Sequence, residues 1–453
     1  MTSFIEFLPF LMFLTLVPLL FSGFPIAFVL GGTGLAFWGL AVLMGLENPN
    51  SFFLVVSRIF GGVVNKQLLV AIPMFIFMGT MMEKSGIARD LLNTLQLMTR
   101  RVPGGLALSV TLLGVILAAT TGIIGASVVM MTLMALPVML ERKYDKPLAT
   151  GTIAASGTLG ILLPPSIMLV VMADLLGTSA GGLFLAAVVP SLMLAVFYLI
   201  YIFTRTSLNP DLAPPMQDTE IEEPLTMAMV FRSFVPPLLL IAAVLGSIFG
   251  GIATPTEASG VGAFGALLLA RLRGELRFTV LRDVVERSTL TTTMLFGLFV
   301  GATAFSYVFA LVGGHDQILH IIQSTGTGGW TVLMILMIAV FLLGFFFDWI
   351  EITLIILPVF APIIAHLDFG GHLADPGLTT MWFAILMAVN LQTSFLTPPF
   401  GFALFYMKGA AADLVDLRDI YRGIIPFVLL QLLGLLAILL WPEIALWLPT
   451  VVK

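Results

Sequence analysis

The sequence has no cysteine, and only 10% of its 453 residues are charged. Without cysteine there can be no disulfide, no thiolate metal site and no cysteine nucleophile. So little charge beside 59% hydrophobic residues excludes an ordinary soluble globular protein. No basic patch with interleaved aromatic residues is present either, which excludes nucleic acid as a partner. Apolar runs of spanning length recur from end to end, so the composition predicts an all-α polytopic membrane protein in a lipid bilayer.

Motifs of intramembrane catalysis are also missing. The chain contains no HExxH zinc pair and no pair of intramembrane aspartates in a protease pattern. Its four histidines fall in segments expected outside the membrane or at their edges, without the spacing of metal ligands. We therefore predict that the protein is not an enzyme and has no cofactor. An intramembrane enzyme is kept as the alternative from another class.

Two apolar stretches of spanning length, 149–177 and 387–409, each carry a Pro-Pro pair near their centre, ending at Pro165 and Pro399. A proline supplies no N–H and drives the preceding residue toward extended geometry, so a continuous helix cannot run through either pair. The peptide groups released at membrane depth are tolerated only where they face protein or a water-filled cavity. Each break therefore predicts a binding site. The alternative is a proline kink that neighbouring helices repair.

A hairpin-sized double run of apolar residues precedes each break, at 103–140 and at 328–366. The first arm has about 16 residues, or roughly 24 Å, against a hydrocarbon core of about 30 Å. We predict re-entrant helical hairpins, with two ordinary spans joined by a tight turn as the alternative. The octets 132–139 and 353–360 match at five of eight positions and close the two hairpins, which favours an internal repeat.

The order of hairpin, broken helix and span divides the chain into two halves. We predict an N-terminal half over 1–204 and a C-terminal half over 231–453, joined by a polar cytoplasmic linker over 205–230 that is rich in proline and glutamate. The broken helices are predicted over 147–177 and 379–411. Each half then contains one hairpin and one Pro-interrupted transmembrane helix.

Lysine and arginine are unevenly distributed over this topology. All but three of the 20, namely Arg58, Lys66 and Lys453, fall on one side, which the positive-inside rule makes cytoplasmic. That side includes a basic interfacial helix expected over 271–287, before a span over 290–312. Both termini then lie outside, and the two hairpins enter from opposite faces. Two repeats of inverted topology with interrupted helices form the architecture of secondary transporters.

Small polar residues surround both predicted breaks. The half-helices after Pro165 and Pro399 direct positive dipole ends inward, and carbonyls before the breaks are free to bind a cation. Bare carbonyls suit Na⁺, while dipole ends with hydroxyls suit a carboxylate. We predict that an organic-anion substrate contacts Ser127, Gly157, Ser166, Asn390, Thr393, Ser394 and Pro399. The alternative is that these residues only allow close helix packing.

Four motifs stand in a characteristic order. They are the tip with Thr121, Gly122 and Ser127, and the stretches 251–258, 157–166 and 390–401. Together they resemble the large membrane subunit of tripartite ATP-independent periplasmic (TRAP) transporters over almost the whole chain. The resemblance implies a Na⁺-coupled importer of organic acids in the bacterial inner membrane that works by an elevator motion. It also implies two partners, a small four-helix membrane subunit on a separate chain and a periplasmic substrate-binding protein.

In that family each Na⁺ site pairs a hairpin tip with the adjacent helix break. By motif position the first site carries over onto Thr121, Gly122, Ile123, Gly160, Leu163 and Pro165. Its counterpart carries over onto Phe347, Asp348, Thr397 and Pro398. The first tip departs from the serine-rich pattern of the family, so backbone carbonyls are the expected ligands there. Na⁺ is the coupling ion, and no other metal is expected.

A stand-alone carboxylate or ion exchanger with a related inverted-repeat fold is the second transport function that the sequence leaves open. It would be coupled to protons through Asp348 and Glu351, which lie three residues apart at the second tip, since ionisable groups at membrane depth mark candidate sites. Such a protein would transport without a binding protein. The sequence does not identify which acid is carried.

Overall fold

The computed structural model describes residues 2–121, 124–216, 225–324, 328–373, 375–399, 401–411 and 414–452. Every regular element in these ranges is helical, as the composition predicted. Among the described residues, eight helices are long and apolar enough to cross a bilayer. The fold is therefore that of an all-α polytopic membrane protein.

The α-helices before the linker contain the first hairpin (α6 and α7) and the first broken helix (α8 and α9). They are α1 (Thr2–Leu20), α2 (Ile26–Leu43), α3 (Phe52–Ile59), α4 (Ala71–Lys84), α5 (Ile87–Thr99), α6 (Gly105–Thr121), α7 (Ile124–Glu141), α8 (Lys146–Thr158), α9 (Ile167–Leu176) and α10 (Ala180–Leu208).

The α-helices after the linker contain the second hairpin (α15 and α16) and the second broken helix (α17 and α18). They are α11 (Met227–Phe249), α12 (Pro255–Leu272), α13 (Phe278–Leu311), α14 (Gly314–Ser324), α15 (Gly329–Leu343), α16 (Trp349–Ile364), α17 (Thr379–Leu396), α18 (Phe402–Ala411), α19 (Leu417–Leu440) and α20 (Glu443–Val451).

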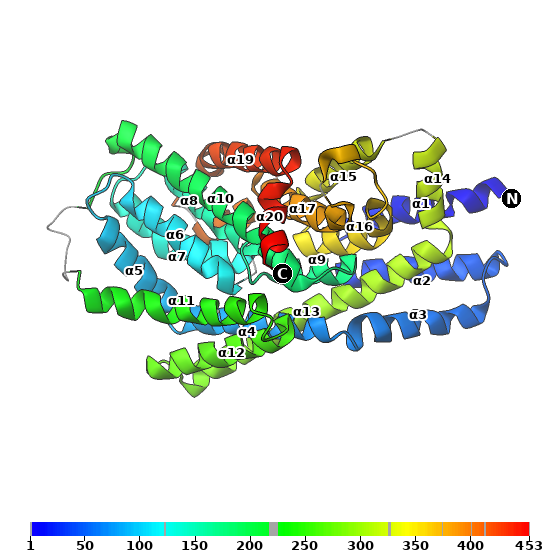
Figure 1. Cartoon of the computed structure of the whole chain (residues 1–453), viewed down its shortest axis with the longest axis horizontal. Coiled ribbons are helices and arrows are strands. Elements are labelled where there is room, and N and C mark those ends of the chain that lie inside the picture. The colour runs from blue at the N-terminus through cyan, green and yellow to red at the C-terminus, as the bar shows by residue number, and fades with distance from the viewer. Residues whose placement is uncertain are drawn as a thin grey trace.

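These helices form an elongated body (Figure 1). The first hairpin lies toward one end of the view with α5, and α14, α15 and α16 lie toward the other end. A group of helices runs along one side, and we call it the frame: α2, α3, α4, α11, α12 and α13. The hairpins and broken helices, α6 to α9 and α15 to α18, are called the central group. Helices within each group pack on one another, and α13 of the frame packs on α16 of the central group.

The two broken helices form the interior of the protein. In α8 every residue from Leu148 to Thr158 is buried, and in α9 every residue from Ile167 to Ala173. In the spanning window of α17, 89% of the residues are buried, against 22% in α11. Because protein encloses these helices, they can be interrupted without exposing peptide groups to lipid.

Helix α8 lies in backbone contact with α19. A Cβ added to Gly151 would fall on the carbonyl group of Gly423, and one added to Gly423 would lie 2.9 Å from the amide nitrogen of Gly151. Neither neighbour is a side chain that could rotate away. Glycine at both positions therefore sets the distance between the first broken helix and α19.

We expect Gly151→Val to destabilise the protein by about 1–3 kcal/mol, because the added methyl groups must push two backbones apart. Heating the detergent-solubilised protein and measuring the folded fraction tests this. The matched control is Gly32→Val in α2, where a Cβ meets no atom within 4 Å. Equal melting of the two variants would mean that α19 moves away at no cost.

The frame differs from the sequence prediction at α13. The prediction of a separate interfacial helix over 271–287 is wrong, because α13 runs unbroken from Phe278 to Leu311. The segment from 278 to 296 contains neither glycine nor proline, so the helix continues although its residues change from polar to apolar. Further along, Gly301 lies against the backbone of Ala27 in α2, which brings these two frame helices close together.

The hairpin arms differ in length. With 15 and 16 residues, α15 and α16 reach roughly 22 and 24 Å. Both fall short of the hydrocarbon core of about 30 Å. By contrast, α7 has 18 residues and meets the length and hydropathy of a span. Arm length thus supports a re-entrant second hairpin, and the depth of the first hairpin stays a prediction.

Candidate functional site at two interrupted helices

The first broken helix is interrupted as the proline pair predicted. Between α8 and α9 lie a 3₁₀ turn, η4 (Leu159–Ile161), and an irregular stretch with a cis Pro164–Pro165 bond. Ser166, the residue before α9, is extended, and its hydroxyl donates to the carbonyl oxygen of Ile161. The first N–H groups of α9 have no acceptor within their own helix, so a positive dipole end is present at the break.

The second break has the same character. Thr397 is extended after the end of α17, and a cis Pro398–Pro399 bond follows. The hydroxyl of Thr397 donates to the carbonyl oxygen of Thr393 at 2.8 Å, which leaves its oxygen lone pairs available as acceptors. Tyr421 of α19 donates to the carbonyl oxygen of Pro399 at 2.5 Å. Phe400 lies outside the described residues.

The two breaks differ in exposure. Pro164, Pro165 and Ser166 are buried, whereas Thr397 and Pro398 are half-buried and Pro399 is exposed. The first break is thus enclosed by the chain itself. The second is open on one side, where a ligand, solvent or another subunit has access to the backbone.

The helices of the first hairpin, α6 and α7, contact η4 at the first break, and those of the second hairpin, α15 and α16, contact α17. At the first tip α6 ends at Thr121 and α7 begins at Ile124. The predicted ligands Gly122 and Ile123 lie outside the described residues, as does the side chain of Thr121. At the second tip Phe347 is buried and donates its N–H to Leu343 at 3.0 Å.

The two broken helices contact each other through Gln392 of α17. Its Nε2 donates to Oγ1 of Thr158, the last residue of α8, over a long 3.5 Å, and both side chains are fully buried. No atom of the described chain donates to Gln392 Oε1. A buried carbonyl oxygen without a donor, next to a helix break, is a ready acceptor for a cation or a substrate hydroxyl.

Each hairpin packs on the broken helices. The backbone of Val128 in α7 lies against Gly157 of α8, with its Cα 3.2 Å from the position of an added Cβ. Tyr406 of α18 covers Gly125 near the first tip, 3.0 Å from an added Cβ. The first hairpin therefore contacts parts of both broken helices.

The second hairpin is held against α17 by polar groups. Asn390 donates from Nδ2 to the carbonyl oxygen of Met337 in α15 at 2.8 Å, and Ser394 lies directly against Gly344 at the end of α15. These two side chains thus contribute to the assembly of the hairpin with its broken helix.

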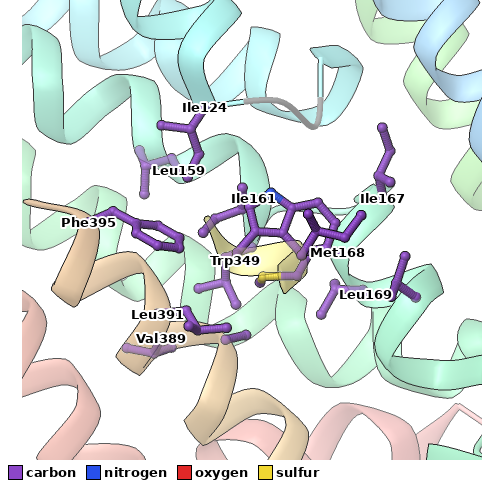
Figure 2. Close-up of a cluster of buried hydrophobic side chains, with 14 of the residues drawn as sticks. Ile124, Leu159, Ile161, Ile167, Met168, Leu169, Trp349, Val389, Leu391 and Phe395 are labelled. Carbon is purple, nitrogen blue, oxygen red and sulfur yellow. The ribbon is translucent and has the colours of Figure 1, made fainter. Parts of the chain in front are cut away.

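Trp349 lies between the second tip and the first break. Figure 2 shows its indole beside Ile161 and Met168 of the first broken helix, with Phe395 of α17 on the other side of Ile161. Trp349 is 4% exposed. In this conformation apolar side chains fill the space around the first break.

The predicted Na⁺ ligands fall into two groups. For the first site, Gly160, Leu163 and Pro165 lie together at the enclosed break, beside the first hairpin. For its counterpart, Thr397 and Pro398 follow the end of α17, and Phe347 and Asp348 lie at the tip of the hairpin that packs against α17. Assignment of Na⁺ to either group stays a prediction.

The predicted substrate residues are spread over the same elements. Ser127 and Gly157 are buried where α7 packs on α8, and Ser166 is buried at the first break. Thr393 and Ser394 donate their hydroxyl protons to Val389 and Leu391 of their own helix and keep oxygen lone pairs. With Asn390 and Pro399 they all belong to the central group.

The two acids at the second tip cap α16. Asp348 Oδ1 accepts the N–H of Trp349 at 2.8 Å, and Glu351 Oε2 accepts the N–H of Asp348 at 3.1 Å. Together they form a capping box. Capping is thus a structural role of both carboxylates, and proton coupling through them stays a prediction.

Residues 177–181 read Gly-Thr-Ser-Ala-Gly, the spacing of a serine nucleophile elbow. The structure gives Ser179 another role, because it is the N-cap of α10 and its Oγ accepts the N–H of Gly182 at 3.2 Å. A strand-to-helix turn, which the elbow requires, is not found here.

Several residues of the site were not predicted. Trp349, Tyr406 and Tyr421 contact the tips and breaks, and Thr158 pairs with Gln392. Their positions depend on how elements far apart in the sequence pack together. The only local signal was that each lies within a few residues of a tip or break, or at the start of the next helix.

A polytopic helical protein with two interrupted helices buried between hairpins belongs to the class of transporters. The crystal structure of the YdaH transporter of Alcanivorax borkumensis has the same fold, with a TM-score of 0.61 over 98% of this chain and 99% of that chain at 15% identity. The chain belongs to the family described as tripartite ATP-independent periplasmic transporter, DctM component, which matches residues 13–444. The resemblance read from the motifs is thereby confirmed.

Two relatives illustrate the range of this family. The C4-dicarboxylate TRAP transporter large permease protein DctM of Pseudomonas aeruginosa is 30% identical over 84% of this chain and 86% of that protein. The ectoine/5-hydroxyectoine TRAP transporter large permease protein UehC of Ruegeria pomeroyi is 30% identical over 96% of this chain and 97% of that protein.

Proposed function

We propose that this chain is the permease subunit of a Na⁺-coupled secondary transporter that imports organic acids across the bacterial inner membrane. The acid is delivered by a periplasmic substrate-binding protein, and a small four-helix membrane subunit on a separate chain completes the system. Both termini lie in the periplasm. Na⁺ binds where each hairpin tip meets its helix break, and the acid binds between the breaks.

The observation that carries the proposal is the burial of two interrupted helices at the centre of the protein, joined by Gln392 and Thr158. Interrupted helices enclosed by protein at membrane depth are typical of the binding sites of secondary transporters. The donor set fits Na⁺, because it consists of backbone carbonyls, hydroxyl oxygens and the unpaired Oε1 of Gln392.

An elevator motion is supported by the division into frame and central group. The hairpins and broken helices contact one another, as a unit that moves together would require. In this motion the central group carries Na⁺ and the acid across the membrane while the frame stays in place. The two repeats have opposite orientation, so that the first hairpin gates the cytoplasmic side and the second the periplasmic side.

The proposed substrate class is supported by the donors at the breaks and by the relatives. The free N–H groups at the start of α9 favour a carboxylate. The Pseudomonas aeruginosa relative carries C4-dicarboxylates and the Ruegeria pomeroyi relative ectoines, by their names. A small organic acid or zwitterion with a carboxylate group is the class that these have in common.

Uptake into proteoliposomes tests the function. The chain is reconstituted with its small subunit, the binding protein is added outside with a labelled acid, and a Na⁺ gradient is compared with an equal K⁺ gradient. We expect uptake only with the Na⁺ gradient and only with the binding protein. Equal uptake with K⁺ would contradict Na⁺ coupling, and uptake without the binding protein would identify a stand-alone exchanger.

A further inference from the structure

A cavity of about 550 Å³ lies between the frame and the central group. Its walls come from α3 and α13 on the frame side and from α9 and α16 on the other. Figure 1 shows α13 passing between α3 on one side and α9 and α16 on the other. We call it the Arg58 cavity; its polar lining residues include Arg58, Lys66, Asp174, Thr303, Ser306 and Tyr307.

The lining carries an excess of positive charge. Arg58 is exposed, with its guanidinium 5.9 Å from the centre of the Tyr307 ring. No carboxylate of the described chain forms an ion pair with it. Lys66 pairs with Asp174 between Nζ and Oδ1 at 2.8 Å, and Asp174 is the only acid in the described lining. One guanidinium is therefore left to bind an anion.

The ion pair itself joins the two groups of helices. Lys66 precedes the 3₁₀ turn before α4, in the frame, while Asp174 lies near the end of α9, in the central group. The side chain of Asp174 is 8% exposed and that of Lys66 is 43% exposed. An incoming anion can therefore reach Lys66 more easily than Asp174.

These cations are also unusual for their place in the sequence. Arg58 and Lys66 are two of only three basic residues that the charge distribution assigns to the outer side of the membrane, and both line the same cavity. Positive charge there has no role in setting the topology, because the positive-inside rule acts on the cytoplasmic loops. A role in binding accounts for it better.

We infer that the Arg58 cavity binds the carboxylate group of a small organic acid on the outer side, as a station separate from the helix breaks. Arg58 binds the carboxylate in the fork geometry that guanidinium groups favour. Asp174 competes with the acid for Lys66, because its carboxylate pairs with the Lys66 ammonium group when no acid is bound. The inference rests on the proposed function for the identity of the anion as an acid in transit.

The absence of cysteine makes a direct test available. In the variant Ser306→Cys, the single thiol lies in the cavity and can be modified by a negatively charged methanethiosulfonate. The full-length protein is purified in phosphatidylcholine nanodiscs, and labelling is followed by mass spectrometry at rising succinate, with chloride as the ionic-strength control. Succinate is the probe, because recognition of the carboxylate group does not depend on which acid is transported.

We expect millimolar succinate to slow labelling of the introduced cysteine, and chloride to leave it unchanged. Adding Arg58→Gln should raise the succinate concentration for half-protection about tenfold, since one charged hydrogen-bonding partner is lost. Arg58→Lys should restore part of the effect. Asp174→Asn should lower that concentration, because Lys66 is then free to bind the probe.

The matched control is Arg282→Gln, which removes the same charge from α13 at a site 24 residues from Ser306, roughly 36 Å along the helix. Succinate should protect the introduced cysteine in this variant as well as it does in the parent Ser306→Cys variant. Protection that is absent at 50 mM succinate, or equal with and without Arg58, would overturn the inference. So would protection by phosphatidylglycerol alone, which would make the ligand a lipid headgroup.

This test is independent of transport. It needs no Na⁺ gradient, no small subunit and no binding protein, so a failed uptake assay would not explain a negative result. Conversely, the protein could show Na⁺-driven uptake while succinate fails to protect the introduced cysteine. That result would support the proposed function and contradict only the binding role of the Arg58 cavity.

Discussion

Replacing Pro165 with alanine should raise the Na⁺ concentration for half-maximal uptake by about 10- to 100-fold. The alanine supplies an N–H and accepts helical geometry, so α8 and α9 can extend toward each other and withdraw carbonyls from the break. A hydrogen-bond-like contact to a charged group contributes about 1.5–3 kcal/mol. Each 1.4 kcal/mol corresponds to about a factor of ten in affinity.

The measurement is initial uptake against external Na⁺ in the same proteoliposomes. Pro190→Ala is the matched control, since Pro190 is a buried proline inside the continuous helix α10. It should leave the Na⁺ dependence unchanged. Thr397→Ala at the second break should also raise the half-maximal Na⁺ concentration, by about tenfold for one oxygen ligand lost. If both break variants kept the wild-type Na⁺ dependence, the breaks would be kinks without a binding role.

The interruptions themselves could be predicted because they depend on local chemistry. A Pro-Pro pair removes an N–H and excludes helical geometry whatever surrounds it, so the sequence alone places the breaks near Pro165 and Pro399. The structure ends α8 and α17 close to these positions. The same holds for the all-α membrane class, which follows from composition.

Side-chain contacts between residues far apart in the sequence could not be predicted. The contact between Gln392 and Thr158 joins residues 234 positions apart, and it depends on how α17 rotates against α8. The polar residues around each break were predicted to bind because carbonyls and hydroxyls suit Na⁺ and a carboxylate, but the sequence does not show which of them face each other. Asn390 shows the consequence, since its amide is engaged with Met337 of the adjacent hairpin.

The distribution of basic residues along the chain gave a clearer signal than the polar residues around the breaks did. The positive-inside rule separates Arg58 and Lys66 from nearly all other basic residues without any knowledge of the fold. Only the structure brings them to one cavity with Asp174. The acids at the second tip illustrate the opposite case: their spacing of three suggested a shared function, and the hydrogen bonds assign both to capping α16.

Trp349→Ala should be the most destabilising single change considered for this protein, at about 3–5 kcal/mol. The indole is 4% exposed and lies between the second hairpin and the first broken helix, so its removal leaves a cavity where the two meet. Ile161, Met168 and Phe395 lie around it and come from η4, α9 and α17, and the packing of these separate elements limits how far they can collapse into the space.

Thermal unfolding in detergent, followed by the folded fraction on size exclusion, measures this effect. Trp447→Ala is the control, because that tryptophan is 57% exposed on α20 and should cost little. Trp349→Phe should fall in between, since the smaller ring fills part of the cavity. If Trp349→Ala and Trp447→Ala melted alike, the second hairpin would not be anchored on the first break. The two halves of the central group would then depend on their remaining contacts, which include the packing of α18 on α7 and the hydrogen bond between Gln392 and Thr158.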